Sequence, residues 1–505
     1  MKFTLFSEPA SALADLPVDL LAVALFKENR NESEIFSILN QRLDGHLGRI
    51  AEEERFLGKP QQTLTVHTHG KIAAPRVLLV GLGSRADATV ADVRHAAAKV
   101  ARAARHVGAK SAGIVFPAGR GDARDVELAC EGVLLGRYKF DRYLTSDESK
   151  HPDMLESVTL AASRELAAAT FEASTRRAQI VAEAAARARD LVNEPAAEMT
   201  PRKLAAVAAE LARDRGLDVE ILDADRCREL GMGMFLAVAQ GSEEEPRFIH
   251  LTYKPKTPAP TPASTKTKKV VLIGKAVTFD SGGLSLKTSQ GMEDMKVDMA
   301  GSAAVIQAIG ALAALEAPVE VHALAAATEN MPSGKSYKLG DVLKSMAGKT
   351  VEINNTDAEG RLTLGDALAF AKTLEPDEIF DFATLTGACM VALGPHIAGV
   401  MSNDPALSER WLAAAKAAGE EMWPLPLPDR LKEQLKSDIA DMRNTGERNG
   451  GALTAGLFLK EFAGTTPWVH VDIAGPATEG KEYGALTKGG TGFAVATIVE
   501  YLTRS

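Results

Sequence analysis

Short apolar runs alternate with amphipathic segments along most of this 505-residue chain. That alternation restricts the fold more than any other feature, because the apolar runs indicate buried strands and the amphipathic segments indicate helices that cover a sheet. In the first 170 residues the expected strands are 20–26, 76–81 and 111–116, and the expected helices are 92–107 and 123–137. The pattern predicts an α/β domain.

The same alternation returns in the second part of the chain. The expected strands there are 247–253, 270–274, 319–326, 378–382 and 468–473, and the expected helices are 201–214, 299–315, 364–373 and 451–463. An alanine- and arginine-rich helix at about 174–192 precedes them and ends before Pro195, because proline disfavours helix in the residue before it. We therefore predict a two-domain α/β protein. Its parts are a smaller N-terminal domain at 1–172, a connecting helix at 173–195 and a larger domain at 196–505, in which helices cover a mixed central sheet.

The net charge of −9 argues against a broad nonspecific nucleic-acid surface. Basic and acidic residues balance at 22 each over residues 1–170, so the acidic excess, 45 against 36, lies in residues 171–505. If this excess marks cation binding, the site belongs to the second part of the chain. Residues 254–269 are rich in proline and lysine, and we interpret them as a solvated loop, with a basic interaction tail as the alternative.

Three cysteines, Cys130, Cys227 and Cys389, stand far apart and show no CxxC spacing. This pattern supports neither a disulfide framework nor a cysteine-built zinc site, and it fits a reducing, cytoplasmic compartment. The N-terminus lacks the apolar core of a secretory signal. The two longest uncharged runs, 299–315 and 382–403, are interpreted as buried core and loops, so no membrane association is expected.

Polar side chains gather in two places in the second part of the chain. The strand at 270–274 leads into Lys275, Asp280 and Lys287, and Asp298 follows. Open α/β sheets place their sites just past the ends of such strands. The second group is Asp357, Glu359 and Arg361. If their segment is extended, alternate residues share one face and these three side chains point into one cavity.

A structural interpretation of the second group is also available. Asn355-Thr-Asp357 is good turn chemistry, so Asp357 alone is more typical of a solvated turn, and Thr363 to Asp366 forms a plausible capping box for the next helix. Taken together, however, the carboxylates need a countercharge in mostly apolar surroundings. Asp280, Asp298, Asp357 and Glu359 carry four negative charges, which match two divalent cations such as Zn²⁺, Mn²⁺ or Mg²⁺. The chain contains no HExxH motif.

These motifs closely resemble those of the leucine aminopeptidase, or cytosol aminopeptidase, family. The family's signature octapeptide NTDAEGRL is complete at 355–362. The further matches follow the family's order over about 190–495, and they are Gly274-Lys275, TFDSGG at 278–283, MKVDM at 295–299, DLVNEP at 190–195, TLTG at 384–387, GGALT at 450–454 and DIAG at 472–475. The first domain matches only loosely.

The resemblance implies a dinuclear metallo-aminopeptidase that releases N-terminal residues from peptides, with leucine and other apolar residues favoured. It implies that Lys275, Asp280, Asp298 and Glu359 hold one Mn²⁺ or Zn²⁺, and that Asp280, Asp357 and Glu359 hold the other. Lys287 and Arg361 are then the catalytic residues outside the metal ligands, with bicarbonate on Arg361 as general base. The resemblance also implies a homohexamer and a substrate groove lined by Met295, Thr384, Leu385 and Gly387.

The chain departs from the family at two positions beside functional residues. Ala276 replaces the usual glycine after Lys275, and Thr288 replaces the usual proline after Lys287. Neither change removes a functional side chain. In the implied chemistry Lys275 ligates as a neutral amine, whereas Lys287 stays charged and stabilises the developing oxyanion.

Two other functions remain open from the sequence. Four carboxylates and two basic residues also suit a different two-metal hydrolase, such as a phosphoesterase, although such sites usually recruit histidines and none lies in these motifs. Some members of the family also bind DNA, partly through the N-terminal domain. The net charge of zero over residues 1–170 gives that alternative no support.

Overall fold

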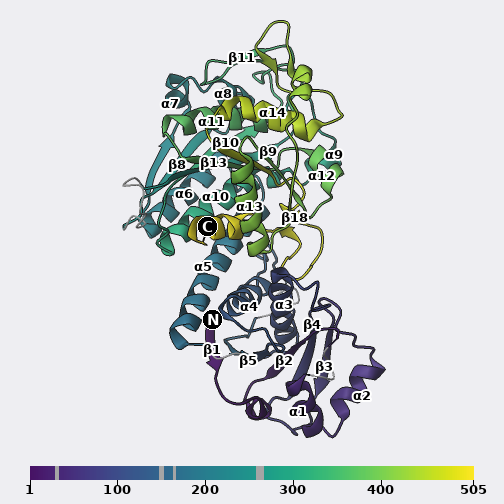
Figure 1. The fold of residues 1–505 in the computed structure, drawn as a ribbon. Coiled ribbons are helices and arrows are strands. Elements are labelled where there is room, and N and C mark those ends of the chain that lie inside the picture. The colour runs from purple at the N-terminus through teal and green to yellow at the C-terminus, as the bar shows by residue number, and fades with distance from the viewer. Residues whose placement is uncertain (29–32, 147–152, 163–165, 257–266, 505) are drawn as a thin grey trace. The chain divides into compact units, whose positions relative to one another are not determined.

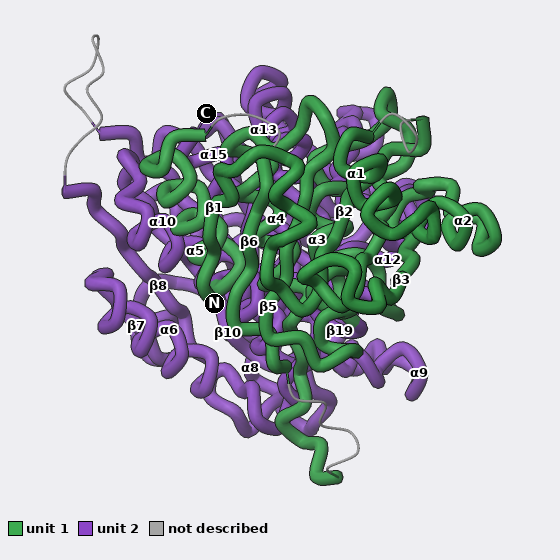
Figure 2. The backbone as a smooth tube through the Cα atoms, turned by 90° about the horizontal axis from the view of Figure 1, so that it is seen from below, with its two compact units in different colours: residues 1–183, 480–487 green, residues 184–479, 488–505 purple. Residues whose placement is uncertain are grey.

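The computed structural model describes residues 1–28, 33–146, 153–162, 166–256 and 267–504. They form two compact units, shown in different colours in Figure 2. One unit contains residues 1–183 and 480–487, and the other contains residues 184–479 and 488–505. Most of the proline- and lysine-rich stretch at 254–269, for which a solvated loop was predicted, lies outside the described residues.

The smaller unit is built on a six-stranded sheet, in which every neighbouring pair is parallel except β3–β4. The strands in spatial order are β1 (Lys2–Phe6), β6 (Ser157–Ala161), β5 (Ser111–Val115), β2 (Leu20–Leu25), β4 (Arg76–Gly81) and β3 (Thr63–His67). Helices α3 (Val90–His106) and α4 (Ala123–Gly136) pack with one apolar cluster, and α1 (Glu34–Arg42) and α2 (His46–Glu53) pack with another. Strand β2 is buried throughout because apolar clusters cover both of its faces.

The larger unit is built on an eight-stranded mixed sheet, which confirms the predicted fold class. Its strands in spatial order are β15 (Met422–Pro424), β14 (Ala398–Ser402), β17 (Trp468–Asp472), β13 (Glu378–Ala383), β9 (Lys269–Asp280), β10 (Glu320–Asn330), β8 (Arg247–Tyr253) and β7 (Asp218–Leu222). The central strands β17, β13, β9 and β10 are parallel, and antiparallel neighbours flank them. The functional side chains are carried by and around the central strand β9.

Helices cover both faces of this sheet (Figure 1). One group contains α6 (Pro201–Arg215), α10 (Ala300–Ala314), α13 (Pro405–Ala418) and α15 (Val495–Arg504), and the other contains α8 (Gly233–Ala239), α11 (Gly360–Thr373) and α14 (Gly451–Ala463). The stretch 289–314 is long and apolar enough to cross a membrane by length and composition, yet 83% of its apolar window is buried inside the structure. Such burial is what a core helix of a folded unit shows.

The remaining elements are short, apart from one long helix. The 26-residue helix α5 (Ala168–Asn193) starts earlier than the predicted connector and contains the boundary between the units. The short elements are α7 (Ala224–Glu229), α9 (Ser289–Met292), α12 (Gly387–Leu393), β11 (Val342–Lys344), β12 (Thr350–Glu352), β16 (Met442–Arg443), β18 (Thr478–Glu479) and β19 (Gly489–Gly490), with 3₁₀ turns at Ala10–Asp15, Met295–Met299 and Asp429–Leu435.

Two local predictions were wrong around the site. Strand β9 does not end at residue 274 but continues to Asp280, because β10 pairs with it along its whole length. Lys275 therefore lies inside the strand rather than in a loop beyond it. The segment that carries Asp357, Glu359 and Arg361 is not extended: it turns at 356–357, and Arg361 already belongs to α11.

The predicted capping box at 363–366 was also wrong, because α11 begins at Gly360, four residues earlier than expected. Thr363 lies in its first turn. Asp366 lies further inside the helix, where its carboxylate accepts hydrogen bonds from the backbone N–H groups of Phe235 at 2.9 Å and Met346 at 2.8 Å. Asp366 therefore ties α11 to two neighbouring segments instead of capping a helix.

Candidate metal centre

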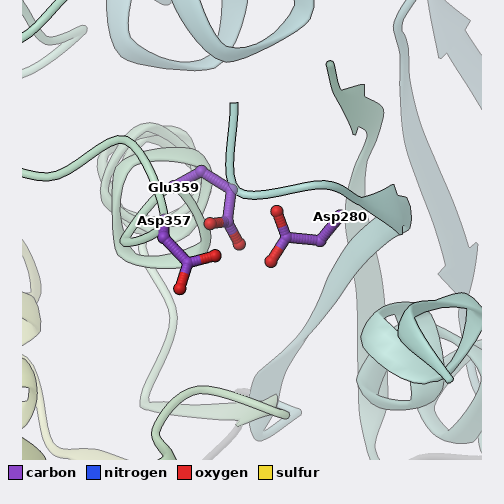
Figure 3. Close-up of side chains that lie close together, drawn as sticks. All are labelled: Asp280, Asp357 and Glu359. Carbon is purple, nitrogen blue, oxygen red and sulfur yellow. The ribbon is translucent and has the colours of Figure 1, made fainter. Parts of the chain in front are cut away.

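Three carboxylates from two segments of the larger unit converge on one small space. Asp280 ends β9, Asp357 lies in the turn before α11, and Glu359 is the residue at the N-cap of α11. One carboxylate oxygen from each lies within 4.8 Å of those from the other two. Figure 3 shows the three side chains directed toward one another. Asp280 and Glu359 are buried and Asp357 is half-buried, so water screens their mutual repulsion only weakly.

Two lysines offset part of this charge. Lys287 Nζ lies 2.9 Å from Asp280 Oδ2 and 2.5 Å from Asp357 Oδ1. Lys275 Nζ lies 2.7 Å from Asp298 Oδ2 and 2.9 Å from Glu359 Oε1, and it donates to the carbonyl of Thr384 at 3.1 Å. Asp298 thereby joins the group through Lys275. With all four carboxylates ionised, two ammonium groups would leave an excess of two negative charges, which divalent cations are suited to neutralise.

The pKa values of these groups follow from burial and from their neighbours. Burial, reinforced by the charge of Glu359, raises the pKa of Asp280 to about 6 despite the two lysines. Burial also raises the pKa of Asp298, although Lys275 opposes this. For Lys275, burial lowers the pKa, but the charges of Asp298, Glu359 and Asp280 outweigh it and raise the pKa above its ordinary value. Lys275 is therefore an ammonium ion in this arrangement and must lose a proton to become a metal ligand.

Arg361 is buried beside this cluster, in the first turn of α11. Its Nη1 donates to the carbonyl of Asn444 at 2.8 Å, while its Nε has no hydrogen-bond partner among the described residues. Burial lowers the pKa of Arg361 to about 10, with the charges of Glu359 and Asp472 opposing this change. A buried guanidinium with an unused donor is suited to hold a small anion.

Of the four residues predicted to line a substrate groove, Thr384 contacts two predicted ligands directly. The other three lie within three residues of Thr384 or Asp298 in the sequence. Met295 begins the 3₁₀ turn that carries Asp298, and Gly387 begins α12. Thr384 contacts two predicted ligands: its carbonyl accepts from Lys275, and its Oγ1 donates to Asp298 Oδ1 at 2.8 Å. Leu385 is half-buried, and its backbone N–H donates to Asp472 at 3.2 Å.

Sequence reasoning assigned no role to several residues that hold this site in place. Asp472 also accepts from Thr386 Oγ1 at 2.7 Å, so it fixes the 385–386 segment. Tyr337 and Asn330 both donate to the carbonyl of Thr356, at 2.8 and 2.9 Å. The DIAG match drew attention to Asp472. A polar residue at the end of an apolar strand is a signal that could have identified Asn330.

A carboxylate-rich centre at the edge of a mixed α/β sheet is the kind of site that metal-dependent hydrolases use. The family model described as the catalytic domain of the cytosol aminopeptidase family matches residues 186–499, and the model of that family's N-terminal domain matches residues 22–147. The chain belongs to the cytosol aminopeptidase family. It is therefore an aminopeptidase of the metal-dependent class.

Individual relatives and solved structures agree with this assignment. The chain is 44% identical over 500 residues to a probable cytosol aminopeptidase of Thermosynechococcus vestitus, a match that covers 97% of this chain and 98% of the relative. A probable cytosol aminopeptidase of a Cyanothece species is 43% identical, with 96% and 97% covered. A mutant of tomato leucine aminopeptidase has a TM-score of 0.89 at 35% identity and covers 100% of this chain and 97% of its own. The bottromycin maturation enzyme BotP in complex with Mn has a TM-score of 0.83 at 35% identity, with 96% and 98% covered.

Gly360 allows Lys275 to approach α11. A Cβ atom at position 360 would lie 2.5 Å from Lys275 Cε and 2.6 Å from its Nζ, so Gly360→Ala must displace the lysine. If Lys275 is a cation ligand, as the family resemblance implies, we expect the affinity for Mn²⁺ to fall by roughly 10- to 100-fold, the range typical of changes to groups that position metal ligands. Isothermal titration calorimetry measures this fall. Gly334→Ala is the matched control, because a Cβ there meets no atom within 4 Å. Equal affinities for Gly360→Ala and wild type would contradict the expectation.

Proposed function

We propose that this chain is a cytoplasmic leucyl-type aminopeptidase that removes N-terminal apolar residues from peptides with the help of two divalent cations, Mn²⁺ or Zn²⁺. The observation that carries the proposal is the convergence of Asp280, Asp357 and Glu359, with Asp298 joined to them through Lys275. The names of the relatives support the reaction, and the Mn bound to BotP supports the choice of metal. Assembly as a homohexamer is part of the proposal and rests on the family resemblance.

In this proposal Lys275, Asp280, Asp298 and Glu359 hold one cation, and Asp280, Asp357 and Glu359 hold the other. The excess of negative charge in the cluster favours this assignment. Bound in this way, two cations lower the pKa of a water molecule and polarise the scissile carbonyl. Lys275 contributes as a neutral amine after it releases its proton.

Lys287 is the group that stabilises negative charge on the substrate oxygen. Its ammonium is only partly buried, and the charges of Asp280 and Asp357 raise its pKa even though burial acts in the opposite direction. Lys287 therefore keeps its charge at neutral pH. A charged donor in a partly dehydrated site stabilises a developing oxyanion more strongly than it stabilises a neutral carbonyl.

Arg361 is proposed to be the residue that would hold bicarbonate, and that anion would supply the general base. The support for this role is the buried guanidinium with its unpartnered Nε. Met295, Thr384, Leu385 and Gly387 line the groove in this proposal. In this proposal the free α-amine of the peptide substrate would be held at the cation site beside the scissile carbonyl. This anchoring would restrict cleavage to the N-terminal residue.

Hydrolysis of matched substrates tests the proposed reaction. We expect the metal-loaded protein to cleave leucine p-nitroanilide, to leave N-acetyl-leucine p-nitroanilide intact because its α-amine is blocked, and to leave p-nitrophenyl phosphate intact. Cleavage of the blocked anilide would refute exopeptidase action. Cleavage of the phosphate ester alone would favour the phosphoesterase alternative.

Metal affinity should depend steeply on pH. Lys275 must release a proton on becoming a ligand, and below the Asp280 pKa of about 6 that carboxyl releases a second one. Asp298, whose pKa burial also raises, releases a further proton wherever it is protonated, so we expect the association constant for Mn²⁺ to rise at least tenfold per pH unit near neutral pH and more steeply below pH 6. Calorimetry in buffers of different ionisation enthalpy counts the released protons. An affinity that stays constant between pH 5 and 8 would contradict this assignment of ligands.

A further inference from the structure

Asn330 lies at the point where the segments that carry the converging carboxylates meet. It is the last residue of β10, it pairs in register with Asp280 at the end of β9, and it is fully buried. Its Nδ2 donates to Asp280 Oδ1 at 2.8 Å and to the carbonyl of Thr356 at 2.9 Å, and it lies 3.5 Å from Glu359 Oε2. One amide group therefore contacts both the strand and the turn that supply the site.

The orientation of this amide is determined by its neighbours. All three atoms near Nδ2 are acceptors, so rotating the amide by half a turn would place its carbonyl oxygen against them. The opposite atom, Oδ1, has no hydrogen-bond partner among the described residues. An unsatisfied buried carbonyl costs about 1–3 kcal/mol. Asn330 Oδ1 therefore remains without a partner among the described residues, while Nδ2 donates to Asp280 and to the carbonyl of Thr356.

The contact with Asp280 determines which of its two carboxylate oxygens faces the proposed cation site. Oδ1 accepts from Asn330 and from the backbone N–H of Gly282 at 2.8 Å. Oδ2 faces Lys287 instead. Because two N–H donors already occupy Oδ1, Oδ2 is the oxygen of Asp280 that a cation would reach, by displacing the Lys287 ammonium.

The contact with Thr356 holds the turn in place together with the Tyr337 hydroxyl, which donates to the same carbonyl at 2.8 Å. Thr356 immediately precedes Asp357, so a hydrogen bond to its carbonyl fixes the distance between the end of β9 and the two ligands in and after the turn. Asn330 is neutral and adds no charge to a cluster that already has an acidic excess. An aspartate of the same shape would lack the donors.

We infer that Asn330 is a positioning residue that preforms the cation site by orienting Asp280 and anchoring the turn of Asp357 and Glu359. This role rests on the proposed two-cation function. Groups that orient metal ligands typically contribute 10- to 100-fold to metal affinity. Asn330 contacts the ligands and not the substrate, so its effect should appear first in metal binding.

The test compares Mn²⁺ affinity of metal-free wild type, Asn330→Leu, Asn330→Ser and Thr328→Val by isothermal titration calorimetry, with circular dichroism to verify folding. Leucine keeps the branched shape of asparagine without its donors, and serine keeps polarity but is too short to reach both acceptors. Thr328 is the matched control, because it is a fully buried polar residue on the same strand whose hydroxyl donates only to a backbone carbonyl, at 3.1 Å.

We expect both Asn330 variants to bind Mn²⁺ at least tenfold more weakly than wild type, and Thr328→Val to stay within twofold. An Asn330 variant that is folded and binds within twofold of wild type would overturn the inference, and so would an equal loss in Thr328→Val. If wild type itself binds no Mn²⁺ or Zn²⁺, the proposed function fails instead. A crystal structure of wild type with Mn²⁺ gives a second test that needs no variant: the Asn330 amide must still donate to Asp280, and an amide turned away overturns the inference.

Discussion

Glu359→Gln should lower kcat/KM for leucine p-nitroanilide by about 1000-fold or more at saturating metal. Glu359 is buried, lies 2.9 Å from Lys275 Nζ, and contributes to both proposed cation sites. Glutamine preserves the shape and removes the negative charge. The charge stabilisation that a cation supplies amounts to several kcal/mol, and each 1.36 kcal/mol corresponds to about a tenfold change in rate.

The matched control for this variant is Glu352→Gln. The Glu352 carboxylate is half-buried and pairs with Arg443 at 3.0 Å and with Ser437, neither of which is a proposed ligand, so its neutralisation should leave kcat/KM within about twofold. Steady-state kinetics and metal analysis of both variants provide the comparison. If the Glu359→Gln enzyme is folded and its kcat/KM lies within tenfold of the wild-type value, Glu359 is not a ligand of the proposed cations.

Lys287→Ala should lower kcat by about 100- to 1000-fold, the loss typical of removing one donor to an oxyanion. The change should not weaken metal binding. The Lys287 ammonium lies against Asp280 and Asp357, so its removal leaves both carboxylates without this partner and should maintain or increase Mn²⁺ affinity. This combination separates a catalytic lysine from a metal ligand.

Measurements of kcat and of Mn²⁺ affinity on the same Lys287→Ala preparation test both parts of this expectation. Lys335→Ala, at an exposed lysine whose pair is with the exposed Glu243, serves as the control and should resemble wild type. A loss of metal from Lys287→Ala that accounts for its lower rate would contradict the assigned role.

The sequence predicted the layers of this fold because its short apolar runs alternate regularly with amphipathic segments. Strands such as 247–253 and helices such as 451–463 occupy the expected residues, since their patterns are governed by burial alone. Lys275 misled the prediction at β9. Charged residues such as Lys275 and Asp280 usually indicate that a buried strand has ended. Here pairing with β10 keeps the backbone extended as far as Asp280.

The start of α11 could not be predicted for a related reason. Glu359 has helical backbone angles at the N-cap and makes no side-chain capping hydrogen bond, so the sequence carries no local start signal. The start of the helix lies close against Lys275, a residue 85 positions earlier, and Gly360 leaves room for that lysine. A local pattern of apolar residues carries no information about such contacts between distant parts of the chain.

The candidate site was predicted in part. The structure brings together Asp280, Asp357 and Glu359, which the motifs had singled out, although the extended geometry expected for 357–361 was wrong. The supporting role of Asn330 depends on which residues of β9 and β10 face each other. Parallel register is set by tertiary packing, so the sequence named the carboxylates but not the amide that orients them.

The most direct test of this account is the rate of leucine p-nitroanilide hydrolysis by metal-stripped protein before and after stepwise addition of Mn²⁺ or Zn²⁺, with bound metal measured at each step. The account predicts an inactive stripped protein whose activity returns as occupancy approaches two cations per chain. Full activity without metal, or no activity on unblocked peptides with two cations bound, would contradict it.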